Sequence, residues 1–182
     1  FNNLNPDFLP LCVHAAMSAV QKICPDARRF MLVPENHTRN AHYLSNVATL
    51  KRILEGAGLT VRIGSLIPDL KQPQVVEASN GTKLVLEPIV RRGNRVGLDG
   101  FDPCAVIVNN DLSAGIPAIL RGVEQVVLPP LVAGWANRRK SHHFHAYDRV
   151  AQEFAKRIGI DPWVVSSFFS QCGKVNFSEQ QL

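Results

Sequence analysis

An uninterrupted apolar run at residues 105–108 ends abruptly in a group of small polar side chains. Such a run is typical of a strand that is buried on both faces of a parallel sheet. Ligands of parallel sheets bind just beyond the carboxyl ends of the strands. Asn109, Asn110, Asp111 and Ser113 follow this run, and we therefore expect them at a binding site.

The first half of the chain alternates between helical and strand patterns. Asn5, Pro6 and Asp7 supply an N-cap, a proline for the first turn and an early carboxylate, which together predict the start of a helix. The predicted elements are a helix from Asn5 to Pro25, a strand at 30–33, a helix at 43–54 that Gly56 and Gly58 end, and a strand at 60–64. A strand, a helix and a strand in this order indicate a right-handed parallel unit.

The second half begins with a different pattern. Residues 75–79 and 83–87 flank Asn80 and Gly81, which predicts an antiparallel hairpin. The glycine- and arginine-rich segment 88–102 could form an edge strand, a mobile flap or both. The remaining predicted elements are a short helix near 116–121, a strand at 126–128, a helix at 141–158 with an apolar stripe of Phe144, Tyr147, Ala151, Phe154 and Ile158, and a final short helix from about 161. Together these elements predict an α/β fold with a mostly parallel sheet, a β-hairpin excursion near 75–87 and a helical C-terminal tail.

Composition narrows the class of protein. With 182 residues, of which 46% are hydrophobic and 19% charged, the chain can bury one substantial core and carry a small appendage. No apolar segment approaches the roughly 20 residues that cross a bilayer, and the first residues do not resemble a signal peptide, so we expect a cytoplasmic protein with no membrane contact. The four cysteines, Cys12, Cys24, Cys104 and Cys172, are widely spaced, which predicts reduced thiols; we expect Cys104 and Cys172 in the core rather than as nucleophiles.

The formal net charge of +5 raises the question of an anionic partner. Basic residues cluster at 91–95 and 138–145, but aromatic residues are not interleaved with them, and no helix-turn-helix or zinc-finger pattern is present. A solvated face or a face that binds small anions is therefore favoured over a nucleic-acid interface. A non-catalytic basic module for nucleic acid or an acidic partner remains the alternative function.

A second polar cluster follows the predicted strand at 30–33. It consists of Glu35, Asn36, His37, Thr38, Arg39 and Asn40. A carboxylate, an imidazole, amides and a guanidinium in six positions could hold a zwitterionic substrate. Asn40 or Thr38 could equally cap the following helix, and the sequence favours neither interpretation.

The cluster at 109–115 also has two interpretations. A capped turn would use some of its polar groups, but two amides and an acid exceed what capping needs, so we favour a binding role. Arg138, Arg139 and Lys140 lie at or just before the predicted helix at 141–158, where free N–H groups favour phosphate or carboxylate; an exposed basic face explains them equally well. The neighbouring His142, His143 and His145 point in different directions on a helix, so we predict no metal site.

Several blocks in fixed order resemble one family. They are residues 34–40, 87–96, 100–104, 109–113 and 138–144, and they are similar to the proteobacterial glutamate-cysteine ligases, the type that resembles ATP-grasp enzymes. The resemblance covers only the amino-terminal portion of that enzyme. It implies a three-layer Rossmann-like domain of the pre-ATP-grasp kind at 1–135, on the substrate side, and at 136–182 a helical linker or the start of a following domain whose remainder is absent.

The resemblance also implies a reaction. It is the ATP- and Mg²⁺-dependent joining of L-glutamate to L-cysteine through an acyl phosphate, the first step of glutathione biosynthesis. The chain has no glycine-rich loop followed by acidic metal ligands, so we expect it to be inactive without the remainder of its own polypeptide, and we assign no catalytic residue. In this interpretation the clusters after Val33 and Val108 face the substrates, and Arg138, Arg139 and Lys140 lie near phosphates or a substrate carboxylate.

Overall fold

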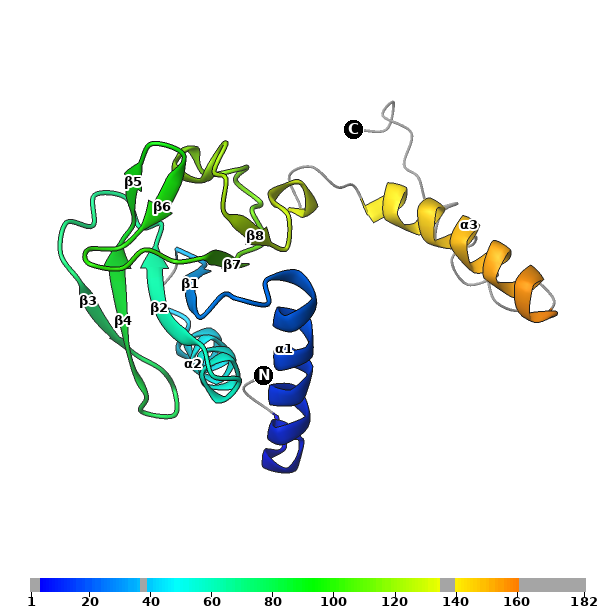
Figure 1. The fold of residues 1–182 in the computed structure, drawn as a ribbon, viewed down its shortest axis with the longest axis horizontal. Helices are drawn as coiled ribbons and strands as arrows, with labels where there is room; N and C mark the ends of the chain where they lie inside the picture. The colour runs from blue at the N-terminus through cyan, green and yellow to red at the C-terminus, as the bar shows by residue number, and fades with distance from the viewer. Residues whose placement is uncertain (1–3, 37–38, 135–139, 161–182) are drawn as a thin grey trace. The chain divides into compact units, whose positions relative to one another are not determined.

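The computed structural model describes residues 4–36, 39–134 and 140–160 of the chain. The chain divides into two compact units, Phe1–Gly134 and Trp135–Leu182. The first unit holds one six-stranded sheet and two long helices, and the described part of the second unit, residues 140–160, holds one long helix (Figure 1).

The central sheet confirms the predicted fold class. Its strands, in spatial order, are β3 (Gln74–Glu77), β4 (Lys83–Pro88), β2 (Thr60–Ser65), β1 (Arg29–Pro34), β7 (Ala105–Asn109) and β8 (Val126–Leu128). Only the β3–β4 pair is antiparallel, and it is the hairpin that Asn80 and Gly81 predicted. Every other neighbouring pair is parallel.

β1 and β7 are buried because both faces of the sheet are covered. In β1 the five residues from Phe30 to Pro34 are buried, and Ala105, Val106 and Val108 of β7 are buried as well. The β1–β7 register sets Pro34 opposite Asn109, so the two strands end side by side. The two polar clusters of the sequence therefore begin at neighbouring positions on one edge of the sheet.

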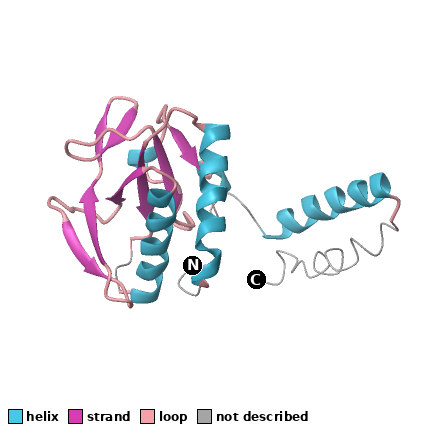
Figure 2. Ribbon diagram, turned by 60° about the horizontal axis from the view of Figure 1, so that its bottom comes forward, coloured by secondary structure: helices cyan, strands magenta, loops and turns pink. Residues whose placement is uncertain are grey.

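Two helices cover one face of the sheet. The first begins where predicted, with Asn5 accepting a hydrogen bond from the Asp7 N–H at 3.0 Å, although its first turn, Pro6–Phe8, is a 3₁₀-helix and α1 runs over Leu9–Ile23. The second, α2 (Ala41–Gly56), is capped by Asn40, which accepts from the Tyr43 N–H at 3.1 Å. Figure 2 shows α1 and α2 side by side, and together with this face of the sheet they enclose a core that includes Phe30, Leu32, Val47, Val61 and Leu86.

The opposite face is covered by short elements. A separate two-stranded sheet of β5 (Val90–Arg92) and β6 (Arg95–Gly97) contributes to a second core with Met31, Val96, Leu98, Phe101 and Leu120. Segment 88–102, for which the sequence left an edge strand, a mobile flap or both open, does contain strands, but β5 and β6 pair with each other around Gly93 and do not join the main sheet. The short helix predicted near 116–121 is the 3₁₀-helix Ala118–Leu120, and a further 3₁₀-helix covers Leu131–Ala133.

The second unit contains α3 (Lys140–Ile158), which confirms the predicted helix. Its apolar stripe is only partly buried: Ala151 is buried, whereas Tyr147, Phe154 and Ile158 are exposed. The side chain of the stripe residue Phe144 and the predicted short helix from about 161 fall outside what the structure describes.

The cysteines differ from expectation at one position. Cys12, Cys24 and Cys104 are free thiols, but Cys104 is exposed and not in the core. Cys104 immediately precedes Ala105, the first buried residue of β7. The Cys104 N–H donates to the carbonyl of Arg29, and this hydrogen bond holds Cys104 at the beginning of the strand. Cys172 lies outside the described residues.

Candidate functional site

The strand order makes the ends of β1 and β7 the expected place for a binding crevice. From β1 the chain continues to β2 on one side, and β7 lies on the other side, so the direction of sheet growth reverses between β1 and β7. In open parallel sheets the ligand-binding crevice lies outside the carboxyl ends of the strands at such a reversal. β1 and β7 end side by side at Pro34 and Asn109, and the loops that begin at Glu35 and Asn110 are in contact here.

Glu35 connects the two loops. Its carboxylate Oε1 accepts a hydrogen bond from the Asp111 N–H at 2.7 Å. Its own N–H donates to the Tyr43 hydroxyl at 2.8 Å. One oxygen of the Glu35 carboxylate is thus used to hold the loop after β7 against the loop after β1.

Tyr43 is a site residue that the sequence did not reveal. Its hydroxyl accepts from the Glu35 N–H and donates to the Asn109 carbonyl at 2.7 Å, so it bridges the ends of β1 and β7. Burial raises the pKa of the Tyr43 hydroxyl to about 12, and the negative charges of Glu35 and Asp111 add to this effect. The hydroxyl therefore stays protonated and keeps both hydrogen bonds. The only signal in the sequence was that Tyr43, an aromatic residue with a hydroxyl, lies three positions after the N-cap Asn40. Its spacing also matches the apolar face of the helix, so the pattern indicated a core residue.

The loop after β7 consists of two consecutive side-chain turns. Asn110 Oδ1 accepts from the Leu112 N–H at 2.8 Å, and Asp111 Oδ1 accepts from the Ser113 N–H at 2.8 Å. The Asn110 amide also donates to the Pro34 carbonyl at 3.3 Å. These are turn-capping contacts, the alternative interpretation of this cluster, and they occupy both the second amide and the acid. The backbone of Leu112 is in the left-handed region, with φ of 54°, and its side chain is buried, which fixes the loop to the core below it.

A hollow of about 440 Å³ opens beside these loops. Four strand ends contribute to it: Asn36 follows β1, Ser65 ends β2, Pro88 ends β4, and the segment 114–117 follows β7. Its remaining lining is mostly apolar, from Leu66, Ile67, Leu70, Ile89 and Ile119, with one carboxylate, that of Asp69. An apolar concavity with a few polar groups is the usual form of a small-molecule site.

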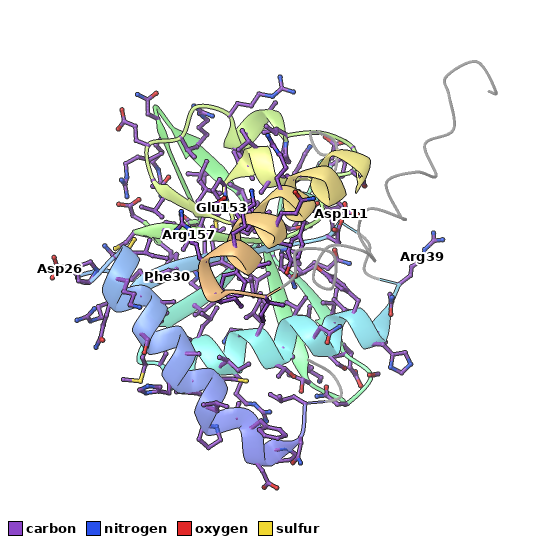
Figure 3. The ribbon with its side chains drawn as sticks, turned by 90° about the vertical axis from the view of Figure 1, so that its right-hand side faces the viewer. Asp26, Phe30, Arg39, Asp111, Glu153 and Arg157 are labelled. Atoms are coloured by element: carbon purple, nitrogen blue, oxygen red, sulfur yellow. The ribbon has the colours of Figure 1, made fainter. Side chains whose placement is uncertain are left out.

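The predicted site residues are only partly brought together. Asn36 lines the hollow. Glu35 and Asp111 do not line it, and the Glu35 carboxylate accepts the hydrogen bond from the Asp111 N–H that joins the two loops. Arg39 is exposed, and Figure 3 shows its side chain projecting outward, away from Asp111. Ser113 is exposed and contributes only its N–H to the described contacts.

The remaining predicted site residues do not line the hollow in the described structure. Within residues 4–36, 39–134 and 140–160, the side-chain amide of Asn109 makes no hydrogen bond, which leaves it available to a ligand. His37, Arg138 and Arg139 lie outside the described residues. Lys140 is the first residue of α3, in the second unit.

The described residues do not by themselves fit a nucleotide and its metal. Among them, no three His, Cys, Asp or Glu side chains converge in a way that could hold a metal ion. The side chains of His142, His143 and His145 lie outside what the structure describes. The sequence also has no glycine-rich phosphate loop. What this edge of the sheet offers is an apolar hollow with an amide, a carboxylate and a hydroxyl, a set suited to a small amino acid.

Comparisons with known proteins settle the family. The family model for glutamate-cysteine ligase, GshA, matches residues 1–182. The chain belongs to the glutamate-cysteine ligase family. This confirms the resemblance that the polar blocks indicated.

A solved structure supports the family and the fold. A protein from Methylobacillus flagellatus KT, assigned as a gamma-glutamylcysteine synthetase, is 63% identical to this chain, with a TM-score of 0.82. The match covers 89% of this chain and 38% of that protein. The chain thus corresponds to well under half of this ligase relative. No curated protein matched the chain.

No helix in the part of the chain described here combines the length and apolar character that a membrane span requires.

Proposed function

We propose that this chain is the amino-acid-binding portion of an ATP-dependent glutamate-cysteine ligase, which makes γ-glutamylcysteine as the first step of glutathione biosynthesis. The observation that carries the proposal is the family match over residues 1–182. It favours a ligase over the alternative of a non-catalytic basic module for nucleic acid or an acidic partner. The hollow at the strand ends is the candidate substrate site, because four strands of the parallel sheet end around it.

The chemistry of the hollow suits a zwitterionic amino acid. A carboxylate such as Asp69 attracts an α-ammonium group, and the amide of Asn36 can donate to an α-carboxylate. The apolar wall excludes water from the substrate side chain and strengthens these polar contacts. L-Glutamate and L-cysteine are the two substrates that the family implies, and either one fits this description.

Arg39 and Glu35 extend the proposed site at its rim. Arg39 is an exposed cation on the loop after β1, and we propose that it draws the substrate carboxylates toward the hollow. Glu35 has one carboxylate oxygen engaged by Asp111. Its charge is available to a substrate ammonium group.

ATP supplies the phosphate that would activate the glutamate γ-carboxylate as an acyl phosphate, and Mg²⁺ would offset the phosphate charge. We propose that these groups bind to other parts of a longer polypeptide, a proposal supported by the 38% coverage of the Methylobacillus protein. Arg138, Arg139 and Lys140 are our candidates for contacts to phosphates or to a substrate carboxylate from this chain. We accordingly expect the chain alone to form no γ-glutamylcysteine from glutamate, cysteine and Mg-ATP.

Titration calorimetry with L-glutamate and with L-cysteine tests the substrate site. We expect saturable binding of at least one of them, and we expect Asp69→Asn and Arg39→Ala to weaken it at least fivefold. Asp26→Asn and Arg92→Ala are matched controls, because both residues are exposed, do not line the hollow and, unlike Arg39, do not belong to the loop after β1. Figure 3 shows Asp26 and Arg39 on opposite sides of the first unit. Equal losses in the test and control variants would contradict the site, as would the absence of binding to the unaltered protein.

A further inference from the structure

A second concave site lies away from the proposed substrate hollow. It is a groove of about 540 Å³ between the second half of α2, the first halves of β2 and β4, and the turn of the β3–β4 hairpin. The hollow is lined by Ser65 and Pro88, the last residues of β2 and β4. The groove is lined by Val61 and Lys83, which lie at the opposite ends of the same two strands.

The groove exists because β2 and β4 separate toward their beginnings. Their pairing starts only at Ile63 with Leu86 and continues for two more residue pairs to Ser65 and Pro88. Before that point the strands diverge, as Figure 1 shows, and Val61 and Leu84 both line the space between them. A parallel sheet is normally closed along a strand pair by continuous hydrogen bonds, so this opening is a local feature of the fold.

The interior of the groove is apolar and its rim is charged. Val61, Ile63 and Leu84 are buried side chains that line it. Four cations and two carboxylates surround them, namely Lys51, Arg52, Arg62 and Lys83 with Glu55 and Glu87. The rim therefore carries an excess of positive charge.

The excess charge is concentrated on two residues. Lys51 pairs with Glu55, and Arg62 pairs with Glu87. Arg52 and Lys83 are exposed and make no hydrogen bond or ion pair within the part of the chain that the structure describes. They come from different elements, α2 and β4, and both line this groove.

We propose that this groove is a binding site for a small organic anion that combines an apolar body with one phosphate or carboxylate group. The apolar body would contact Val61, Ile63 and Leu84, and the anionic group would lie between Arg52 and Lys83. Thr49, Asn80 and Thr82 also line the groove and offer hydrogen bonds to further polar atoms of the ligand. The proposal does not depend on the amino-acid site, since the two concavities share no lining residue.

Four simple probes distinguish the contribution of the apolar body from that of the anionic group. Phenyl phosphate and benzoate carry both an apolar ring and an anion, inorganic phosphate carries only the anion, and benzyl alcohol carries only the ring. We expect phenyl phosphate or benzoate to bind saturably in titration calorimetry, at least fivefold more tightly than inorganic phosphate or benzyl alcohol. Which of the two anions binds more tightly identifies the phosphate or the carboxylate as the natural group.

A charge-matched pair of variants locates the site. Arg52→Gln with Lys83→Gln should weaken phenyl phosphate or benzoate binding at least tenfold. Lys22→Gln with Arg92→Gln removes the same charge from exposed residues outside the groove and should leave binding within twofold of the original. Asp69→Asn, in the hollow, should also leave it within twofold. Far-ultraviolet circular dichroism checks that each variant is folded.

Three results would overturn the proposal. They are no saturable binding of either ring-bearing anion, equal weakening by the two double variants, and loss of binding in Asp69→Asn. A chemical-shift map provides a second measurement that needs no variant: the backbone amides of Val61, Thr82 and Leu84 should shift on titration with phenyl phosphate. Shifts confined to the hollow would contradict the groove.

Discussion

The hydroxyl of Tyr43 donates a hydrogen bond of 2.7 Å to the carbonyl of Asn109, which lies 66 positions away in the sequence. The same oxygen accepts from the Glu35 N–H at 2.8 Å. One side chain at the start of α2 thereby joins the ends of two adjacent parallel strands. Because these ends form the edge at which the candidate site opens, Tyr43 determines how the two loops face each other.

Tyr43→Phe should destabilise the protein by about 1–3 kcal/mol, because it leaves the Glu35 N–H and the Asn109 carbonyl without their shared partner. Chemical denaturation measures the free energy of unfolding. Hydrogen exchange provides a local check, since the Glu35 amide should lose protection in the variant. An unchanged unfolding free energy together with unchanged protection of this amide would show that the bridge contributes nothing.

The same residue predicts a pH dependence. The folded-state pKa of Tyr43 is about 12, above the ordinary value of 10.0, so folding favours the protonated hydroxyl. The stability from this protonated group is fully present below pH 10 and should decrease as the pH rises from 10 to 12. The unfolding free energy of Tyr43→Phe should fall less steeply over this range. Identical slopes for the two proteins would contradict the raised pKa.

Glu35→Gln separates the structural role of this residue from a role in binding. The amide oxygen of glutamine can still accept from the Asp111 N–H, so we expect the unfolding free energy to change by less than about 1 kcal/mol. If the carboxylate binds a substrate ammonium group, the affinity for L-glutamate or L-cysteine should fall about tenfold, which corresponds to about 1.4 kcal/mol. Glu35→Ala is the companion variant, and it should lower both stability and affinity. Full affinity in Glu35→Gln would leave Glu35 with its loop-holding role alone.

The ion pair of Arg62 and Glu87 should stabilise the protein more than the neighbouring pair of Lys51 and Glu55. The guanidinium donates through Nε to Glu87 Oε1 at 2.8 Å and through a second nitrogen to Glu87 Oε2. It also donates to the Asp99 carbonyl and lies over the Phe101 ring at 5.1 Å. The hydrogen bonds to Glu87 raise the pKa of Arg62, in keeping with a favourable pair. Arg62→Met should cost about 1–3 kcal/mol of stability, because the largely buried Glu87 carboxylate loses its partner.

The matched control for this pair is Lys51→Met. Lys51 and Glu55 form a helix-surface pair four residues apart on α2, which should be worth about 0.3–0.5 kcal/mol. Thermal and chemical denaturation of both variants measure the difference. Equal costs for Arg62→Met and Lys51→Met would show that the bidentate geometry adds nothing to an ordinary surface pair.

Cys104 should be the most reactive of the three described thiols. Partial burial raises the pKa of the Cys104 thiol, but hydrogen bonds from the backbone of Arg28 and Arg29 and the positive charge of Arg29 outweigh it, so the pKa lies below its ordinary value. In a Cys172→Ser background, iodoacetamide should modify Cys104 before Cys12 and Cys24, and Arg29→Gln should slow this reaction. Mass spectrometry of the labelled peptides gives the order. Earlier labelling of Cys12 or Cys24 would contradict the assignment.

The elements that were predicted correctly depend on residues close together in the chain. Apolar runs identified β1 and β7, Asn80 and Gly81 identified the β3–β4 hairpin, and Asn5 and Asn40 cap the helices through contacts to residues two and three positions away. Local sequence is sufficient for these features because the interacting groups are held near each other by the covalent chain. The polar blocks likewise indicated the glutamate-cysteine ligase family from the sequence alone, and the family match confirms it.

Gln125 illustrates what local pattern could not provide. It is buried and its amide bonds to both backbone groups of Val96 and to the Pro103 carbonyl, which ties the β5–β6 segment to the main sheet. Sequence reasoning assigned that segment to an edge strand or a flap, because nothing in 88–102 itself shows what it will pair with. Gln125 and Val96 are 29 positions apart in the sequence, so whether they meet depends on strand register and packing.

For this protein, the sequence by itself determined the parallel strands, the hairpin, the helix starts and the family. Only the tertiary structure decided which polar groups hold loops and which remain available for binding. The sequence favoured a binding role for Asn110 and Asp111, but the fold uses both side chains in turns, while Asn36 and Asp69 line the hollow. The physical reason is that a polar side chain acquires its role from the donors and acceptors within about 3 Å, and distant strands supply those neighbours only when they come together.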